Sequence, residues 1–330
     1  MTHSWKPFLI VMLLLIVISH GRADGREGGV SRFPALFSGS RYIAYTPRSF
    51  SVVKGVVTPA TPSGIESDLK TLRSCFDGLV TYSALNGLEK IPEIAKQKGF
   101  RAIILGIWDP ASPVELQHVL ASIEKYPEIV AAVIVGNEGL YSKRYQTVAV
   151  ETAIKKIKAV YPELPVATSE PFFLYLEPAY FHFFNIADFL APNVHPVFEP
   201  WFKPENPEQG VSMVIQVVEK MKAAYGKPVL VKETGMPSGP ESRGFTKERQ
   251  ARFWKAFIEG APTSAGRDYV CFEAFDAPWK PSVMAETFPG DHVAEGFWGF
   301  FSADGSQKPV VKMIPWPLSE RSADKERGKE

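Results

Sequence analysis

The sequence has little cysteine and almost no net charge. It contains 2 cysteines among 330 residues and carries a formal net charge of +1. Cys75 and Cys271 form no Cys-x-x-Cys motif and have no clustered histidines beside them, so no thiolate metal site is indicated. We expect two buried free thiols, although an exported protein could form a disulfide. The chain also lacks the basic stripe that phosphate-backbone binding requires, which argues against a nucleic-acid partner.

No apolar run in the sequence is long enough to span a bilayer comfortably. Lys6 precedes twelve apolar or small residues, 8–19, and a polar Gly-rich stretch follows. This order is typical of a secretory signal peptide, which we place at residues 1–23. The mature protein is therefore expected to be secreted or periplasmic. The alternative is an uncleaved N-terminal segment that anchors the protein to a membrane.

The rest of the chain divides into a linker, one large domain and a tail. Residues 24–38 are rich in Gly and Arg and predict a linker, and residues 39–315 are enough for a single domain with a full hydrophobic core. Residues 316–330 are charged and poor in hydrophobic residues, which predicts a disordered tail.

Short runs rich in β-branched residues alternate with stretches of helical periodicity through the domain. Eight such alternations predict an α/β fold, the (β/α)8 TIM barrel. A doubly wound open sheet is the second choice, because no Gly-x-Gly-x-x-Gly motif opens a helix after any of the strands. The predicted strands are Tyr42–Tyr45, Leu79–Tyr82, Ala102–Leu105, Ala132–Val135, Val166–Thr168, Phe189–Val194, Val229–Glu233 and Val270–Phe275.

Two of these strands end on a glutamate. The fourth strand runs into Asn137-Glu138, and the seventh ends at Glu233 before a turn rich in Gly, Pro and Ser. A carboxylate is costly to bury and needs a reason to be there. Strands four and seven face each other across a (β/α)8 barrel, whose functional residues gather at the carboxyl ends of the strands. We therefore expect the two carboxylates within a few ångströms of each other; the structural alternative is that each pairs with a Lys or Arg of the barrel.

Other strand ends are also polar or aromatic, which describes a concave polar site with platforms for stacking. Neither these residues nor the glutamates show a spacing that suggests a metal site. The further candidates for this site are Tyr82, Trp108, Asp109, Asn193, His195, Glu273, Asp276 and Trp279, whereas Glu170, at the end of the fifth strand, is expected to be mainly structural.

The ordered motifs resemble those of glycoside hydrolase family 17, the β-1,3-glucanase and β-1,3-glucanosyltransferase family. The resemblance covers about residues 40 to 312, and the last motif is similar to the bacterial and fungal branch. The segments that carry it are Val135-Gly136-Asn137-Glu138, Glu233-Thr234-Gly235-Met236-Pro237-Ser238 and Phe272-Glu273-Ala274-Phe275-Asp276-Ala277-Pro278-Trp279-Lys280, supported by Thr81-Tyr82-Ser83, Leu105-Gly106-Ile107-Trp108, Ala191-Pro192-Asn193-Val194-His195-Pro196 and Trp298-Gly299-Phe300-Phe301.

The resemblance implies a retaining mechanism on a β-glucan polysaccharide or oligosaccharide, with no cofactor. It implies Glu138 as the general acid/base and Glu233 as the nucleophile, with Asn137 on the sugar hydroxyl next to the reacting carbon. The expected substrate-binding residues are Tyr82, Asn137, Asn193, His195, Glu273 and Trp279. Structural alternatives stay open for four of them: His195 as a scaffold residue, Glu273 as a brace of the barrel, and Tyr82 and Trp279 as core residues.

The chain departs from the family pattern at two positions. Met236 stands where the family usually has Trp, and Val80 stands where it usually has Arg. These changes put a sugar-stacking surface and a polar contact in doubt, but they leave both glutamates in place. The choice between hydrolysis and transfer stays open, as do two alternatives: an inactive barrel that binds β-glucan, and a barrel glycosidase for another β-linked glucan.

Overall fold

The computed structural model describes residues 41–260 and 267–314. The segments predicted as signal peptide (1–23), linker (24–38) and tail (316–330) lie outside these residues. Most of the domain predicted for 39–315 lies within them. In the described part of the chain, none of the helices combines the length and the apolar character needed to cross a membrane.

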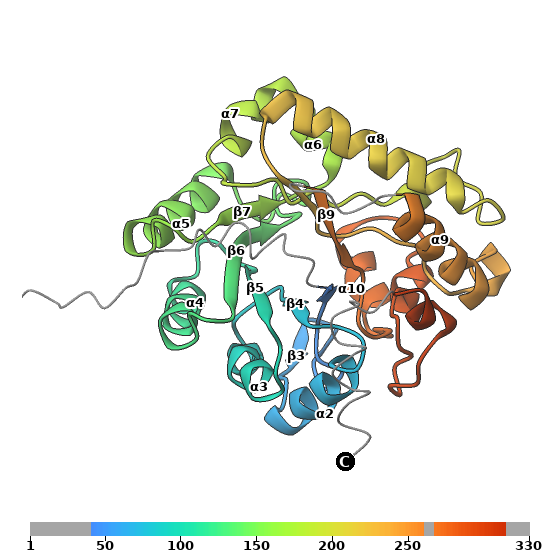
Figure 1. The fold of residues 1–330 in the computed structure, drawn as a ribbon, viewed down its shortest axis with the longest axis horizontal. Coiled ribbons are helices and arrows are strands. Elements are labelled where there is room, and N and C mark those ends of the chain that lie inside the picture. Colours follow the sequence, from blue (N-terminus) through green and yellow to red (C-terminus); the bar gives the residue numbers. More distant parts are fainter. Residues whose placement is uncertain (1–40, 261–266, 315–330) are drawn as a thin grey trace, which may run out of the picture. The chain divides into compact units, whose positions relative to one another are not determined.

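Seven parallel strands form one curved sheet, and helices surround it (Figure 1). The strand order is β7-β6-β5-β4-β1-β9-β8, which is the order of a barrel opened between β7 and β8. All six strand pairs of this sheet are parallel. The strands are β1 (Tyr42–Ala44), β4 (Gly78–Val80), β5 (Ala102–Ile107), β6 (Val130–Asn137), β7 (Val166–Ser169), β8 (Val229–Val231) and β9 (Arg267–Cys271).

The segment 189–194 closes the barrel between β7 and β8. Leu190 bridges Val229, and Asn193 bridges both Pro171 and Glu233. These isolated bridges connect the two edges of the sheet, so the described domain is a (β/α)8 barrel, as predicted.

The prediction that Phe189–Val194 forms a regular strand was wrong. The segment makes bridges only, and one physical reason is Pro192, which has no N–H to give to a ladder. Its carbonyl still accepts from the Lys232 N–H at 2.9 Å, so the segment keeps its place in the barrel wall without continuous pairing.

An antiparallel hairpin after β1 was not predicted. It pairs β2 (Ser51–Val53) with β3 (Val56–Thr58). The two residues between them, Lys54 and Gly55, have φ values of 49° and 72°. Positive φ at both positions is the geometry of the tight turns that join twisted strands. The Lys-Gly pair between two Val-Val steps was the signal for this turn.

The helices begin and end at residues with suitable capping chemistry. The Ser112 hydroxyl accepts from the Glu115 N–H at 3.2 Å at the start of α4, and the Thr246 hydroxyl accepts from the Arg249 N–H at 3.2 Å before α9. Gly226 ends α8 with a φ of 64°. The helices are α2 (Pro62–Leu72), α3 (Ile91–Gln97), α4 (Pro113–Lys125), α5 (Thr147–Val160), α6 (Phe172–Tyr175), α7 (Phe181–Phe184), α8 (Glu208–Tyr225), α9 (Lys247–Gly260) and α10 (Lys280–Thr287).

Two clusters of buried hydrophobic residues form the core. The larger joins the strands to the surrounding helices, and the smaller fills the inside of the barrel, where Val80, Ile104, Ile134 and Leu230 belong. The barrel is therefore a packed body whose chemistry must take place at its ends. Both cysteines are buried and unpaired, as expected.

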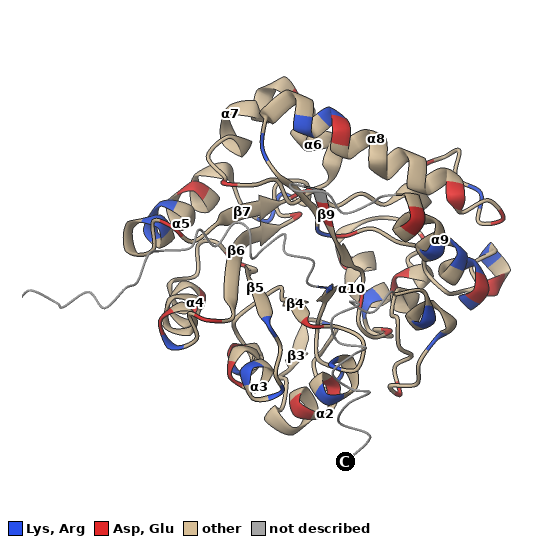
Figure 2. Cartoon of the chain, viewed as in Figure 1, with Lys and Arg blue, Asp and Glu red and all other residues tan. Residues whose placement is uncertain are grey.

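Charged side chains of both signs alternate over the outer helices (Figure 2). This distribution agrees with the near-zero net charge of the sequence. It gives no support to a binding mode that depends on one large field of a single sign.

Candidate active site

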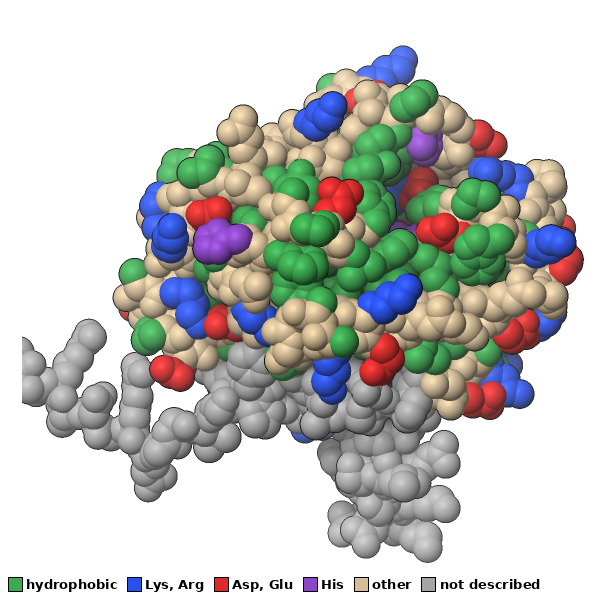
Figure 3. All heavy atoms as spheres, turned by 90° about the horizontal axis from the view of Figure 1, so that it is seen from above, with side chains coloured by type: hydrophobic (Ala, Val, Ile, Leu, Met, Phe, Trp, Pro, Cys, Tyr) green, Lys and Arg blue, Asp and Glu red, His purple; other side chains and the backbone are tan. Residues whose placement is uncertain are grey.

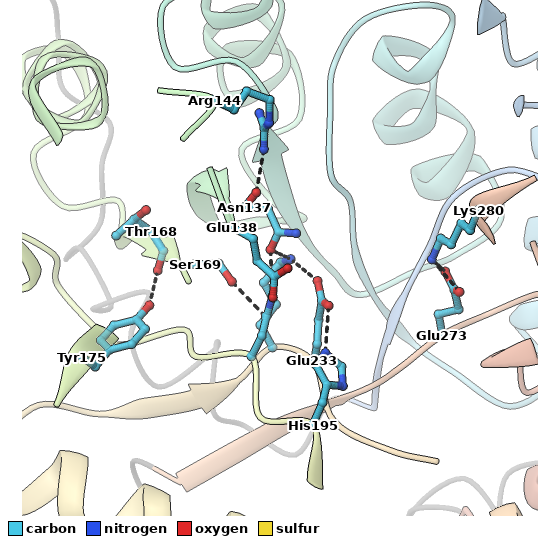
Figure 4. A network of polar contacts seen from close by, with 12 residues as sticks. Asn137, Glu138, Arg144, Thr168, Ser169, Tyr175, His195, Glu233, Glu273 and Lys280 are labelled. Atoms are coloured by element: carbon cyan, nitrogen blue, oxygen red, sulfur yellow. Dashed lines mark hydrogen bonds and ion pairs between the residues drawn. The ribbon is translucent and has the colours of Figure 1, made fainter. Parts of the chain in front are cut away.

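Glu138 stands on a tight turn at the carboxyl end of β6. Gly136 has a φ of 81° and Glu138 a φ of 53°, so the chain turns through left-handed backbone at the end of the strand. A side chain on Gly136 would meet the Tyr145 hydroxyl, since a Cβ there would lie 2.1 Å from it. The Glu138 N–H donates to the Ser169 carbonyl at 2.9 Å. This backbone turns the half-buried Glu138 side chain toward Glu233 (Figure 4).

Glu233 lies just beyond β8, beside a lysine and a histidine. Its side chain is buried, and one carboxylate oxygen, Oε1, is 2.9 Å from Lys232 Nζ. The other, Oε2, is 3.3 Å from His195 Nε2. One carboxylate oxygen from each of Glu138 and Glu233 and a ring nitrogen of His195 lie within 4.8 Å of one another. The structure therefore brings together the two glutamates that the sequence predicted to face each other.

The surroundings of the two glutamates push their pKa values in opposite directions. Burial raises the pKa of Glu138, and the negative charge of Glu233 raises it further. Burial alone would raise the pKa of Glu233 too, but the Lys232 ammonium and His195 outweigh it and hold that pKa well below its usual range. The pair therefore favours a proton on Glu138 and a negative charge on Glu233.

Asn137 and Asn193 join Glu138 to Lys232, which in turn pairs with Glu233, through side-chain hydrogen bonds. The Asn193 Nδ2 group donates to Glu138 Oε1 at 2.8 Å and to Asn137 Oδ1 at 3.1 Å. Asn193 Oδ1 accepts from the Ser169 hydroxyl at 3.0 Å, which fixes the orientation of its amide. Lys232 Nζ donates to the same Asn137 Oδ1 at 2.8 Å. Two donors on this oxygen direct the NH2 group of Asn137 away from them.

Glu273 forms a second buried pair, with Lys280 rather than with Lys232. Lys280 Nζ lies 2.6 Å and 2.5 Å from the two Glu273 carboxylate oxygens. Burial raises the pKa of Glu273 to about 7, although Lys280 opposes the shift. Figure 4 shows this pair separate from the network around Glu233.

Trp279 and Tyr82 lie on different sides of the candidate site, Tyr82 beside Lys232 and Trp279 beside Glu273. Trp279 contacts Phe50 edge-to-face at 5.8 Å between ring centroids, and it lines a pocket with Glu273 and Asp276. The Tyr82 ring lies under Lys232, whose Nζ is 4.0 Å from the ring centroid. Tyr82 therefore adjoins the glutamate network directly, whereas Trp279 adjoins the Glu273 side of the site.

Lys232 was not singled out in the sequence, although it contacts Glu233, Asn137 and Tyr82. The signal was present: Lys232 is the one charged residue that follows the apolar run Val229–Val231, directly before Glu233. A buried cation beside a candidate nucleophile is itself a candidate for a functional role.

The two residues that depart from the family pattern are both buried. Met236 is fully buried in the cluster between barrel and helices, and Val80 belongs to the cluster inside the barrel. Neither side chain offers an exposed surface to a sugar.

Glu138, His195 and Glu233 are also the one group of three acidic or histidine side chains, within residues 41–260 and 267–314, that could share a metal ion. A divalent cation would meet the Lys232 ammonium, which already contacts the Glu233 carboxylate. Like charges at this distance repel strongly in a buried site. The chemistry of this donor set therefore favours acid–base and nucleophilic roles over metal binding.

Exposed aromatic side chains follow the carboxyl ends of several barrel strands. Trp108 follows β5, Tyr141 follows β6, and Phe198 and Trp201 follow the closing segment 189–194; their exposed fractions run from 43% to 60%. Figure 3 shows one face of the molecule, where hydrophobic side chains gather around a hollow in which charged and histidine side chains are visible. Flat apolar faces around polar groups suit sugar rings, which have an apolar face and a polar edge.

A (β/α)8 barrel with two close carboxylates at the ends of its fourth and seventh strand positions is the architecture of a glycoside hydrolase. The family model of the BtgE/BtgC glycoside hydrolase domain matches residues 42–299, so the chain belongs to that family. The predicted resemblance to glycoside hydrolase family 17 is confirmed.

Two curated relatives share about a quarter of their residues with this chain. One, a glucan 1,3-beta-glucosidase of Arthroderma benhamiae, is 26% identical over 263 residues, which cover 74% of this chain and 82% of the relative. The other, a glucan 1,3-beta-glucosidase of Saccharomyces cerevisiae, is 24% identical over 278 residues, which cover 76% and 85%.

Solved structures of the same fold include a glycoside hydrolase family 17 β-1,3-glucanosyltransferase of Rhizomucor miehei, with a TM-score of 0.62 at 20% identity, covering 86% of this chain and 98% of that one. An endo-laminarinase of Formosa superposes with a TM-score of 0.66 at 18% identity, covering 86% of this chain and 88% of that one. At these identities the superpositions show the fold.

Proposed function

We propose that the protein is a retaining β-1,3-glucan glycosidase or transglycosidase. The observation that carries the proposal is the spacing of Glu138 and Glu233, whose nearest carboxylate oxygens lie within 4.8 Å. Retaining enzymes place the two carboxyl groups about 5–5.5 Å apart, whereas inverting enzymes separate them by about 6.5–9.5 Å to admit a water. The opposite pKa shifts of the two glutamates support different roles for them.

In the proposed mechanism, Glu138 gives its proton to the leaving glycosidic oxygen while Glu233 attacks the anomeric carbon. The bond between the sugar and its leaving group breaks, and a covalent glycosyl–Glu233 intermediate forms. Glu138, now ionised, takes a proton from the incoming acceptor as that acceptor displaces Glu233. In this mechanism the NH2 group of Asn137 donates to the neighbouring sugar hydroxyl, a bond that strengthens in the transition state.

The substrate class in this proposal comes from the relatives. Both curated relatives are named glucan 1,3-beta-glucosidases, and one solved relative is a β-1,3-glucanosyltransferase in complex with laminaritriose. Hydrolysis and transfer share the glycosyl-enzyme and differ only in whether water or a sugar hydroxyl accepts. We propose that five residues contact the substrate or hold the groups that do: Tyr82, Asn193, His195, Glu273 and Trp279.

We also propose that residues 1–23 direct export, so that the enzyme meets its glucan outside the cytoplasm.

A product profile tests the proposal. Residues 24–330 are incubated with a linear β-1,3-gluco-oligosaccharide of defined length, and the products are sized by chromatography over time. Shorter products alone indicate a hydrolase, and products longer than the starting sugar indicate a transferase. Absence of turnover on this and on other β-glucans, combined with retained glucan binding, would replace the proposal with a glucan-binding protein.

A further inference from the structure

Lys232 is a buried cation whose contacts all bear on the candidate active site. Only 1% of its side chain is exposed, and burying an ammonium costs several kcal/mol unless partners compensate. Its Nζ lies 2.9 Å from Glu233 Oε1, 2.8 Å from Asn137 Oδ1 and 4.0 Å from the centroid of the Tyr82 ring. These three partners are candidates for the nucleophile, the sugar-hydroxyl donor and a substrate contact.

The surroundings of Lys232 include the apolar interior of the barrel. Val80, at the end of β4, is buried in this interior. Leu230 belongs to the same interior cluster. Lys232 directly follows β8, and the Tyr82 ring beneath its Nζ packs against this interior cluster. The Lys232 ammonium therefore lies where the apolar interior of the barrel meets the polar groups of the candidate active site.

We propose that Lys232 is a positioning residue of the candidate active site: its ammonium keeps Glu233 ionised and fixes the Asn137 amide with the NH2 group turned toward the sugar. The inference rests on the proposed function. Asn193 supplies the second donor to Asn137 Oδ1, at 3.1 Å, so both lone pairs of that oxygen are used. An amide held at its oxygen in this way has one orientation left for its donors.

The charges around Glu233 show why Lys232 matters most for its ionisation. Lys232 and His195 both favour the carboxylate, and of the two only the lysine carries a full charge without taking up a further proton. The negative charge of Glu233 in turn raises the pKa of its neighbours Glu138 and Glu273, and Tyr82 lies beside the same carboxylate. Burial lowers the pKa of the Lys232 ammonium and the charge of Lys280 lowers it further, whereas Glu233 opposes this shift. Without Lys232, burial of Glu233 is offset by the histidine alone.

The test is the pH dependence of kcat/KM on a β-1,3-gluco-oligosaccharide for the Lys232→Met, Lys232→Gln and Lys232→Arg variants of the full chain. The methionine removes both charge and hydrogen bonds, the glutamine replaces the ammonium by a shorter, neutral amide that can still donate, and the arginine keeps a cation. We expect the acid limb, which reports ionisation of the nucleophile, to move to higher pH by about one unit or more in the first two variants. We expect kcat at the optimum to fall on the order of 10²-fold, with a smaller change in KM. Lys232→Arg should restore the acid limb.

Lys308→Met is the matched control. Lys308 is equally buried, and it pairs with Asp276 at 2.5 Å rather than with Glu233. Its loss should lower the melting temperature without moving the acid limb. An acid limb in Lys232→Gln that coincides with that of the unmodified protein, together with a loss of kcat no larger than in Lys308→Met, would show a purely structural lysine and overturn the inference. If Lys232→Met does not fold, Lys232→Gln decides the question. Absence of turnover in the unmodified protein would instead overturn the proposed function, and the inference with it.

Discussion

Two buried lysine–glutamate pairs in this barrel have glutamates whose pKa values are shifted in opposite directions. Lys232 contacts Glu233 at 2.9 Å, and Lys280 contacts Glu273 at 2.5 Å. Burial raises the pKa of both glutamates, yet the pKa of Glu233 ends well below its usual range and that of Glu273 at about 7. Glu233 has His195 as a second favourable partner, whereas Glu273 has Lys280 alone and meets like charge from Glu233 and Glu295.

The comparison shows that an ion pair does not by itself set the charge of a buried carboxylate. Desolvation disfavours the charged form of both Glu233 and Glu273, and the combined effect of all neighbouring charges and hydrogen bonds decides whether the pKa ends above or below its usual value. The geometrically tighter pair, on Glu273, is the one with the raised pKa. A short contact is therefore weak evidence that a buried carboxylate is ionised.

The largest expected effect separates the two glutamates by their part in the reaction. Glu233→Gln removes the proposed nucleophile and should lower kcat on the order of 10⁴-fold or more. Glu273→Gln removes the carboxylate of the other pair and should lower kcat by less than about 10²-fold, since Glu273 is placed to support the site and not to form a bond. Steady-state kinetics on one oligosaccharide compares them directly. Equal losses in the two variants would contradict the assignment of Glu233.

The next effect concerns stability and pH. Glu273 binds a proton more tightly in the folded protein, with a pKa of about 7 against a usual value of 4.5. Between those values the folded state holds a proton that the unfolded state has lost, so this group lowers stability as pH rises from about 4.5 to 7 and its effect is level above 7. The difference corresponds to a few kcal/mol at most.

Glu273→Gln should flatten this fall, since an amide does not titrate. Thermal unfolding of the variant and of the unmodified protein at pH 5 and at pH 7 measures the change. An exposed substitution, Glu259→Gln, is the control and should leave the profile as it was. A steeper fall between pH 5 and pH 7 in Glu273→Gln would contradict a raised pKa at this position.

A third buried carboxylate extends the comparison to partners without charge. Glu170 accepts from the N–H groups of Leu140 and Tyr141 at 3.0 and 3.2 Å and from the Tyr145 hydroxyl at 3.1 Å. Burial raises its pKa to about 7 despite these bonds. Neutral donors thus stabilise this carboxylate less than the neighbours of Glu233 stabilise theirs.

Glu170→Gln should destabilise the fold by about 1–2 kcal/mol and loosen the turn that carries Glu138, because an amide has one acceptor oxygen where the carboxylate has two. Hydrogen exchange should speed up at the Leu140 and Tyr141 amides ahead of the barrel strands. Tyr145→Phe, which removes only one of the three donors, is the milder variant for comparison. Unchanged exchange at these two amides would show that the turn is held by other contacts.

The smallest expected effect comes from an ion pair at the surface. Arg252 and Glu208 contact each other at 2.9 Å, with about half of each side chain exposed. Water screens such a pair, so Arg252→Gln should change the free energy of unfolding by no more than about 0.5 kcal/mol. Chemical denaturation measures it. A change of several kcal/mol would contradict the view that burial, and not pairing, gives the interior pairs their influence.

Local patterns were enough to predict the barrel and the two glutamates. A run such as Val130–Val135 ends on Asn137-Glu138 in the sequence and in the structure alike, since hydrophobic burial and strand ends depend on neighbouring residues. The conformation of segment 189–194 was harder to predict, because Pro192 removes a hydrogen-bond donor from the ladder while tertiary contacts still hold the chain in place. The hairpin at Lys54-Gly55 carried a local signal and was missed.

The charge states at the site could not be read from the sequence. They depend on residues brought together from distant elements: Lys232 and His195 around Glu233, and Asn193 between Asn137 and Glu138. No spacing rule connects these positions. Sequence reasoning therefore finds the carboxylates and leaves their protonation to the fold.

The two free cysteines allow opening of the barrel to be measured by thiol modification. Cys75 and Cys271 are 8% and 2% exposed, and burial raises the pKa of the Cys271 thiol. A thiol reagent needs both access and a thiolate, so it can modify Cys271 only when strand β9 leaves the barrel. The rate at which Cys271 is modified under native conditions then reports how often strand β9 leaves the barrel, without any introduced label. Each variant described above can be timed in this way beside its activity.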